Sequence, residues 1–482
     1  MGGDPHVVPG PLRKAFAERF QGSRRPDVPD SKKGVFIVRK GILGAFLLTL
    51  IAGLAWAGIK ILQNMPSTYV YPVDGHIVGN VYRGNQTLLS IMMPGASFND
   101  PRGVACAFLK SDDDPKDPFD DVEITVVGAN SGANQLFYNA SLKKIRKFGT
   151  AGSGQDQFND PRGVAIHPDG TVAVADSGNH RIVLLHHDGT KLTWTRALGG
   201  PGTEPGQFDS PAAVAFDSRR NLYVADAGNH RLQVLSGQGK WSVLSTGVSL
   251  TGPEALCVID SKEAWTFFRE GPFADRIAVV DQAGQRLTTY SLDGKFMNVA
   301  RSGLLPGGPA TLSGIAFDYY GNVVATDIAA SCLRKFDKEL KYLCSFGSEG
   351  ENRHQFLHPR GIAINKQLGQ VVVAEEKSAH YLWVGADADG FAPVAEGAGW
   401  RFPFVLTERA TLNATVKDNA GKPVTSLLNN VEWEEGKREF AWIPDASLPD
   451  GFYILEFDLM ATYSSRERIL KRFTLTLKKS KL

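Results

Sequence analysis

The sequence has little cysteine. Its 482 residues include four: Cys106, Cys257, Cys332 and Cys344. No two are spaced as C-x-x-C, which argues against a structural zinc ribbon. Cys332 and Cys344 are expected on adjacent strands in a register that favours two free buried thiols, with a disulfide as the alternative.

An excess of either charge is also missing. Lys and Arg number 53 and Asp and Glu number 51, a net charge of +2. This balance argues against a nucleic-acid-binding protein held by a general basic field. The length predicts two or three domains. The 51 Gly and 26 Pro recur between short apolar runs, which is typical of many strands and tight turns.

Charge is absent altogether from Gly41 to Ile59, where the sequence reads GILGAFLLTLIAGLAWAGI. As a helix this run would span about 28 Å, close to the hydrocarbon thickness of a bilayer. We therefore predict a transmembrane helix at 41–60. The preceding residues 1–40, predicted to be mostly disordered, hold nine Lys and Arg against four Asp and Glu. By the positive-inside rule they lie in the cytoplasm and the rest of the chain lies outside.

A signal peptide is the alternative for this segment. Ala55-Trp56-Ala57 has the small-x-small form of a cleavage site, and cleavage there would release the rest of the chain. The 40 residues before the apolar run exceed the usual charged region of a signal peptide. The pattern favours an uncleaved anchor.

Internal repeats organise the middle of the chain. FNDPRGVAIHPDGTVAVADSGNHRIVLLHHDGT begins at Phe158 and FDSPAAVAFDSRRNLYVADAGNHRLQVLSGQGK at Phe208. Four weaker copies begin at Phe98, Pro253, Leu312 and Phe356. Each unit reads as four short strands joined by turns, which predicts a propeller blade.

The V-A-D-x-G-N-H-R strings of these units resemble the NHL repeat. The resemblance implies a six-bladed β-propeller over residues 87–385, with 61–86 as a stalk. WD40 blades would need a Trp-Asp signature, which is absent. We expect residues 87–93 to supply the missing fourth strand of the sixth blade and so remove an open sheet edge.

The pattern changes in residues 401–482, after a linker at 386–400. Alternating strands joined by Asn-Ala-Gly and Pro-Asp-Gly turns predict a β-sandwich. The order VKD-x-x-GK-x-V, then W-x-P and DG-x-Y, resembles the Ig-like domain of flagellar hook-capping proteins. The predicted fold class is all-β, a six-bladed NHL propeller and an Ig-like sandwich after one transmembrane helix.

The recurring Pro-Arg-Gly supplies the first candidate site. Arg102, Arg162 and Arg360 are each expected to open an innermost strand, where the central channel meets one face. Three guanidinium groups there suit an anionic or carbonyl ligand. The alternative is that each arginine pairs with an acidic neighbour.

Carboxylates close the second strand of five blades, and three of them are candidates for the same ligand-binding face: Asp176, Asp226 and Asp327. The alternative is a structural role in the turn that follows. Asp112, Asp113 and Asp114 belong to an acidic segment that could hold Ca²⁺. Because this segment lacks the spacing of a known calcium loop, a solvated hairpin tip is favoured, and no other cofactor is expected.

Because no catalytic constellation is found, we expect a non-enzymatic binding or scaffold protein. It would be tethered to the outer face of a bacterial cytoplasmic membrane and present its propeller to a protein, peptide or glycan within an envelope assembly. Nucleic acid is excluded as a partner by topology. The alternative is a metal-dependent lyase or hydrolase resembling peptidyl-hydroxyglycine amidating lyases. Its channel zinc would need about three converging histidines, and only His167 and His358 are near inner-strand positions.

Overall fold

The computed structural model describes residues 59–63, 65–71, 83–110, 124–139, 145–263, 267, 270–463 and 468–480. The chain divides into two units, Met1–Ala57 and Gly58–Leu482, and every described residue belongs to the second. The predicted tail at 1–40 and the predicted transmembrane helix, apart from Ile59 and Lys60, lie outside the described residues. Within the described part, no helix has the length and apolarity needed to cross a membrane.

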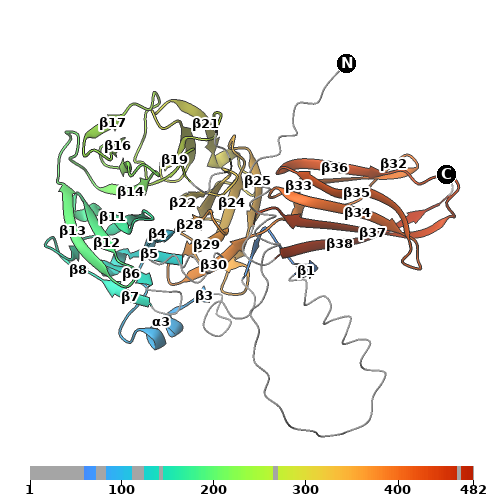
Figure 1. The fold of residues 1–482 in the computed structure, drawn as a ribbon, viewed down its shortest axis with the longest axis horizontal. Coiled ribbons are helices and arrows are strands. Elements are labelled where there is room, and N and C mark those ends of the chain that lie inside the picture. The colour runs from blue at the N-terminus through green and yellow to red at the C-terminus, as the bar shows by residue number, and fades with distance from the viewer. Residues whose placement is uncertain are drawn as a thin grey trace, which may run out of the picture. The chain divides into compact units, whose positions relative to one another are not determined.

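Six sheets form the repeat region, five of them with four strands and the sixth with an additional two-residue strand (Figure 1). The first sheet contains β4 (Pro101–Phe108), β5 (Ile124–Asn130), β6 (Gln135–Asn139) and β7 (Ile145–Phe148). The second contains β10 (Pro161–Ile166), β11 (Thr171–Asp176), β12 (Arg181–His187) and β13 (Leu192–Gly199). The third contains β14 (Pro211–Phe216), β15 (Leu222–Asp226), β16 (Arg231–Leu235) and β17 (Trp241–Leu244).

The remaining sheets continue this order. The fourth contains β18 (Ala255–Ile259), β19 (Arg276–Asp281), β20 (Arg286–Tyr290) and β21 (Phe296–Arg301). The fifth contains β22 (Leu312–Phe317), β23 (Val323–Asp327), β24 (Cys332–Phe336) and β25 (Tyr342–Phe346). The sixth contains β28 (Gly361–Asn365), β29 (Gln370–Ala374), β30 (Ala379–Val384) and β2 (Tyr69–Val70). All-β architecture built from repeated four-stranded sheets agrees with the sequence prediction of a propeller.

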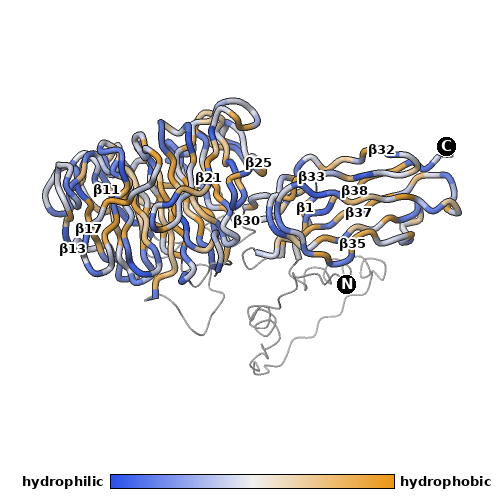
Figure 2. The backbone as a smooth tube through the Cα atoms, turned by 90° about the horizontal axis from the view of Figure 1, so that it is seen from above, coloured by the Kyte–Doolittle hydropathy of each residue, from blue (hydrophilic) through white to orange (hydrophobic). Residues whose placement is uncertain are grey.

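Side chains that alternate along a strand pack against the neighbouring blades on its two sides. In β11, Val172 and Val174 pack in the core shared with the first blade. The intervening Ala173 and Ala175 pack in the core shared with the third blade. Because successive strand residues point to opposite faces, a strand that is apolar at every position fills two cores at once. Figure 2 shows the apolar stretches running through the blades.

The first strands of the six sheets form an inner ring. Each contacts the next, and β28 contacts β4, which closes the circle. Glycine permits this close approach. A Cβ on Gly103 would lie 2.2 Å from the carbonyl oxygen of Arg162, and one on Gly361 would lie 2.0 Å from that of Arg102.

The sixth blade is completed by an N-terminal segment, but the predicted segment is wrong. β2 pairs with β30 through Tyr69 and Val384, and β3 (Arg83–Gly84) pairs with the same strand farther along. The predicted closing residues 87–93 instead fall largely in helix α3 (Gln86–Met92). Asn85 caps this helix by accepting a 3.0 Å hydrogen bond from the Leu88 amide, and this local capping outweighs the strand pattern of the segment. The expected stalk therefore carries strands.

Two further sheets form the C-terminal module. One has the order β1 (Ile59–Gln63), β38 (Arg468–Lys479), β37 (Gly451–Ala461), β34 (Ala410–Lys417) and β35 (Pro423–Trp433). The other contains β31 (Ala388–Asp389), β33 (Gly399–Leu406), β32 (Val394–Glu396) and β36 (Gly436–Trp442). Side chains from both sheets share one core that includes Phe402, Leu412 and Phe457. The expected linker 386–400 thus contributes two strands, and the Ig-like relationship stays a prediction.

Buried polar contacts join this module to the fifth and sixth blades. The Lys335 ammonium forms an ion pair with Glu408 and lies 3.3 Å from Asp318 Oδ2. All three side chains are at most 1% exposed. Tyr463 donates to the Asn365 carbonyl at 3.1 Å. Elsewhere, the four cysteines are free, as favoured from the sequence. Cys344 lies opposite Lys335 and Cys332 opposite Asp327, so the two thiols are not cross-strand partners.

Four short elements complete the loops between blades. They are β8 (Thr150–Ala151), β9 (Gln157–Phe158), β26 (Ser348–Glu349) and β27 (Gln355–Phe356). β8 pairs with β9 and β26 pairs with β27, both in parallel. Two of the loops that lead into inner strands are therefore hydrogen-bonded to themselves.

Candidate functional site

The six inner strands begin around one opening of the channel, here called the mouth. Arg102 and Arg162 are the second residues of β4 and β10, and Arg360 directly precedes β28. The fourth blade has Glu254 at this place. The amides of Glu254 and Arg360 each donate at 2.8 Å to the residue before the closing acid of their blade, Val280 and Ala374 respectively. The six equivalent residues in blade order are Arg102, Arg162, Ala212, Glu254, Ser313 and Arg360.

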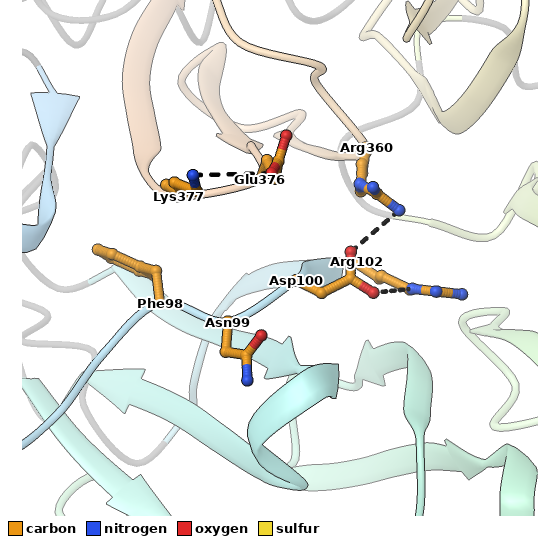
Figure 3. Close-up of a pocket in the computed structure, with 7 residues that line it drawn as sticks. All are labelled: Phe98, Asn99, Asp100, Arg102, Arg360, Glu376 and Lys377. Atoms are coloured by element: carbon orange, nitrogen blue, oxygen red, sulfur yellow. Dashed lines mark hydrogen bonds and ion pairs between the residues drawn. The ribbon is translucent and has the colours of Figure 1, made fainter.

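Each arginine of the mouth has a carboxylate partner. Asp100 Oδ2 accepts from Arg102 Nε at 2.8 Å, and its other oxygen lies 3.0 Å from Arg360 Nη1 (Figure 3). Asp160 accepts from Arg162 Nε at 2.8 Å. The acidic neighbours anticipated as the alternative are therefore present. The arginine side chains nevertheless keep 34%, 35% and 27% exposure at 102, 162 and 360, and so remain open to a ligand.

A polar hollow of about 300 Å³ lies where the sixth and first blades meet at the mouth. Figure 3 shows the residues that line it, which are Phe98, Asn99, Asp100, Arg102, Arg360, Glu376 and Lys377. The Nε of Arg360 is buried and has no hydrogen-bond partner among the described residues. The hollow thus combines both signs of charge with an unused donor. Arg162 is not part of its lining.

The predicted carboxylates Asp176, Asp226 and Asp327 lie below this face and are fully buried. Asp176 accepts hydrogen bonds from the Asn159 amide at 2.7 Å and from Arg181 Nε at 2.7 Å. Asp226 and Asp327 accept equivalent bonds from the loop amide and from the arginine of the next strand. A carboxylate saturated in this way serves structure, so the turn-stabilising alternative describes these residues better than ligand binding does.

The same arginines also donate hydrogen bonds to backbone carbonyl groups of the loops around the mouth. Arg181 donates to the Ser153 carbonyl at 2.6 Å and to the Gln157 carbonyl at 2.8 Å. Arg231 makes the matching bonds to the loop of the third blade, including one to the Gln207 carbonyl at 2.9 Å. Arg334 donates to the Pro306 carbonyl at 2.6 Å. These arginines were not among the residues predicted from the sequence, although Arg181 and Arg231 follow Asp176 and Asp226 at the same five-residue interval.

Glu254 was also missed. Although the residue is exposed, partial burial of its carboxyl group raises the pKa, and the charges of Arg162 and Arg102 act in the opposite direction. Asp281 adds a smaller contribution that raises the pKa. Aligning PEALCV with PRGVAI would have placed Glu254 at the arginine position. The fourth blade is the most divergent, which hid this equivalence.

The residues considered as possible metal ligands are not brought together in the described part of the chain. Asp112, Asp113 and Asp114 lie outside the described residues. In the described part of the chain, no group of three or more His, Cys, Asp or Glu is arranged to hold a metal ion. His167 Nδ1 lies 3.0 Å from Asp169, and His358 Nδ1 lies 3.0 Å from Glu376. Each histidine is thus engaged within its own blade.

An exposed apolar side chain lies on the same face of the propeller as the mouth, in the loop between the fourth and fifth blades. Leu304 ends the 3₁₀ turn η4 (Ser302–Leu304) in the loop that leads into β22, and it is 82% exposed. The loop is anchored on both sides of it, since the Ser302 amide donates to the Gln285 carbonyl at 3.0 Å and Pro306 accepts from Arg334. A large apolar side chain is therefore held in solvent by a fixed backbone.

Comparison with known proteins supports the repeats. The NHL repeat family matches residues 158–183 and 208–235, which are parts of the second and third blades. The chain contains NHL repeats. No curated protein matches it.

Several solved structures are similar to this chain at low sequence identity. Virginiamycin B lyase from Staphylococcus aureus is 14% identical, with a TM-score of 0.39 over 55% of this chain and 82% of that one. A streptogramin B lyase is 13% identical, with a TM-score of 0.39 over 62% and 96%. The WD40 repeats of RRP9 are 12% identical, with a TM-score of 0.38 over 60% and 99%.

Proposed function

We propose that this protein is a membrane-tethered, extracytoplasmic binding protein that receives a protein, peptide or glycan partner on the mouth face of its propeller. The observation that carries the proposal is the fixation of the mouth loops. Buried pairs such as Asp176 with Arg181 hold these loops by their carbonyl groups. A loop already held in one shape loses less entropy on binding, so its contacts contribute more fully to affinity.

The mouth face also offers the side chains that a partner site needs. Leu304 supplies an exposed apolar anchor, and the hollow beside Arg102 and Arg360 supplies polar contacts of both signs. Interfaces of this kind combine a buried apolar anchor with a polar surround. The C-terminal module, which we propose to be Ig-like, would give the protein a second contact surface within an envelope assembly.

Tethering rests on the uncharged run at 41–59 and on its basic N-terminal flank. The compact unit begins at Gly58, directly after the alternative cleavage position at Ala57. The folded unit is therefore whole under either fate of the segment. Proteolysis by a protease added outside intact spheroplasts tests the topology, because an outward-facing propeller is cut and a cytoplasmic one is protected.

The binding function is tested by co-purification. The full chain, extracted in detergent from membranes of its own cells, is expected to bring down a specific partner. Leu304→Asp should abolish recovery of that partner, because a charge cannot occupy an apolar pocket. Lys240→Asp is the matched control, since Lys240 is exposed in the turn between β16 and β17 on the opposite face. Equal recovery with both variants, or no specific partner with the wild-type chain, would refute the proposal.

A further inference from the structure

The ring of residues at the mouth is polarised. Three consecutive blades, the sixth, first and second, contribute Arg360, Arg102 and Arg162. The other three contribute Ala212, Glu254 and Ser313. In a ring of six, the fourth blade lies opposite the first, so Glu254 faces Arg102 across the opening. The repeat would place like residues at all six positions, and this ring departs from that symmetry.

Backbone contacts show that these residues follow one another closely at one level. A Cβ on Gly163 would lie 2.8 Å from the carbonyl oxygen of Ala212, and one on Gly314 would lie 2.6 Å from that of Arg360. Together with the equivalent contacts of Gly103 and Gly361, these distances fix four of the six junctions. The side chains therefore surround one narrow opening.

Glu254 has no ion-pair partner within 4 Å among the described residues, although two guanidinium groups act on its charge from across the opening. Glu254 is exposed, so its carboxylate, like the guanidinium groups of the ring, is open to a ligand that enters the opening.

We propose that the mouth binds a short peptide with free termini, its carboxylate held by Arg102 and Arg162 and its ammonium held by Glu254. This inference rests on the proposed function, because the peptide would bind on the same face of the propeller as the partner. A planar guanidinium accepts a carboxylate through paired hydrogen bonds, and Glu254 supplies the opposite charge that an ammonium requires. Ser313 of the fifth blade, which stands between Glu254 and Arg360 in the ring, adds a hydroxyl group as a further polar contact for the peptide.

The same charges discriminate against other ligands. Asp100 and Asp160 already neutralise part of the basic half through their 2.8 Å bonds to Arg102 and Arg162, and Glu254 repels a second negative charge. A polyanion is therefore disfavoured. A simple cation is disfavoured by the three guanidinium groups. A ligand with separated opposite charges satisfies both halves.

The experiment is a titration calorimetry series on the full chain in detergent, with triglycine, N-acetyl-triglycine and triglycine amide as probes. Triglycine is expected to bind, and each capped form to bind at least about tenfold more weakly, because each cap removes one charge. In Glu254→Gln, triglycine and its acetylated form should bind equally, since the ammonium has lost its partner. Glu339→Gln, at an exposed turn residue, is the control and should bind like the wild-type chain.

Two results would overturn the inference: no saturable triglycine heat up to about 10 mM, or capped and free peptides of equal affinity. The melting temperature of Glu254→Gln verifies folding, and we expect it to rise. If the Leu304-dependent partner is recovered while triglycine does not bind, the ligand inference alone has failed. If triglycine binds and no partner is recovered, the partner function has failed.

Discussion

Asp226 accepts a hydrogen bond from Arg231 Nε at 2.9 Å, and through this pair a buried carboxylate determines the shape of a surface loop. Arg231 also donates to the Gln207 carbonyl at 2.9 Å, and the Asp209 amide donates to Asp226 at 2.8 Å. The loop 200–210 is therefore held by this pair of side chains from the two strands behind it. The same arrangement recurs at Asp176 and Arg181.

Replacing Asp226 by Ala should destabilise the protein by about 3–5 kcal/mol, because it leaves the Arg231 guanidinium without its buried counter-charge. Chemical denaturation measures this loss. Hydrogen exchange should accelerate in loop 200–210, with little change in the C-terminal module. Glu339→Gln disrupts an exposed pair and should leave unfolding unchanged. Unaltered exchange in loop 200–210 would show that the pair does not hold the loop.

Because β2 and β3 pair with the last blade, we expect a truncation that removes them to lower the stability of the propeller. A chain that begins at Gly58 retains β2 and β3 and should unfold in one cooperative transition. A chain that begins at Pro66 lacks only β1 of the C-terminal module and is the control. One that begins at Gln86 also lacks β2 and β3 and leaves β30 as an open edge, so it should aggregate or unfold at lower temperature than the control. Circular dichroism and size-exclusion chromatography compare the two. Equal stability would restore residues 87–93 as the closing segment.

Lys335 lies at the junction with the C-terminal module, and we expect substitutions of Lys335 and Glu408 to have non-additive effects on the free energy of unfolding. Lys335→Met should cost about 3–5 kcal/mol, because it leaves the Glu408 carboxylate buried without an opposite charge. Adding Glu408→Met should recover part of that loss, since the second change removes the stranded charge. Denaturant titration of the wild type and the three variants gives the coupling. Additive losses would indicate that the two groups do not interact.

Glu254 predicts a pH-dependent difference in stability. Partial burial raises the pKa of its carboxyl group above the ordinary 4.5. The neutral form therefore favours the folded state, and this stabilisation is complete below the ordinary pKa and is lost as the pH rises through the raised one. Glu254→Gln should match the wild-type melting temperature in acid and exceed it at neutral pH. A constant difference across this range would contradict the shifted pKa.

Sequence patterns located the blades well because their physical signals are local. The Gly-Asn-His-Arg turns need a left-handed residue, which His180 and His230 supply with φ of 52° and 56°. Strand alternation then assigns the two faces. Arg102, Arg162 and Arg360 were placed at the mouth by the same repetition.

The errors arose where one local signal competed with another. QTLLSIM reads as an apolar strand, but the cap at Asn85 makes it a helix, and the two-residue strands β2 and β3 are too short to produce a pattern. Glu254 was hidden by a divergent blade. The structural role of Asp176 depends on its partner Arg181 and on complete burial, and neither could be measured from spacing alone.

Site-specific photo-crosslinking in living cells tests the central claim most directly, because it asks which face of the propeller meets a partner. A photoreactive amino acid replaces Leu304 on the mouth face in one strain and Lys240 on the opposite face in another. We predict a discrete, light-dependent adduct from position 304 and none from position 240. An adduct from position 240 alone would contradict the account.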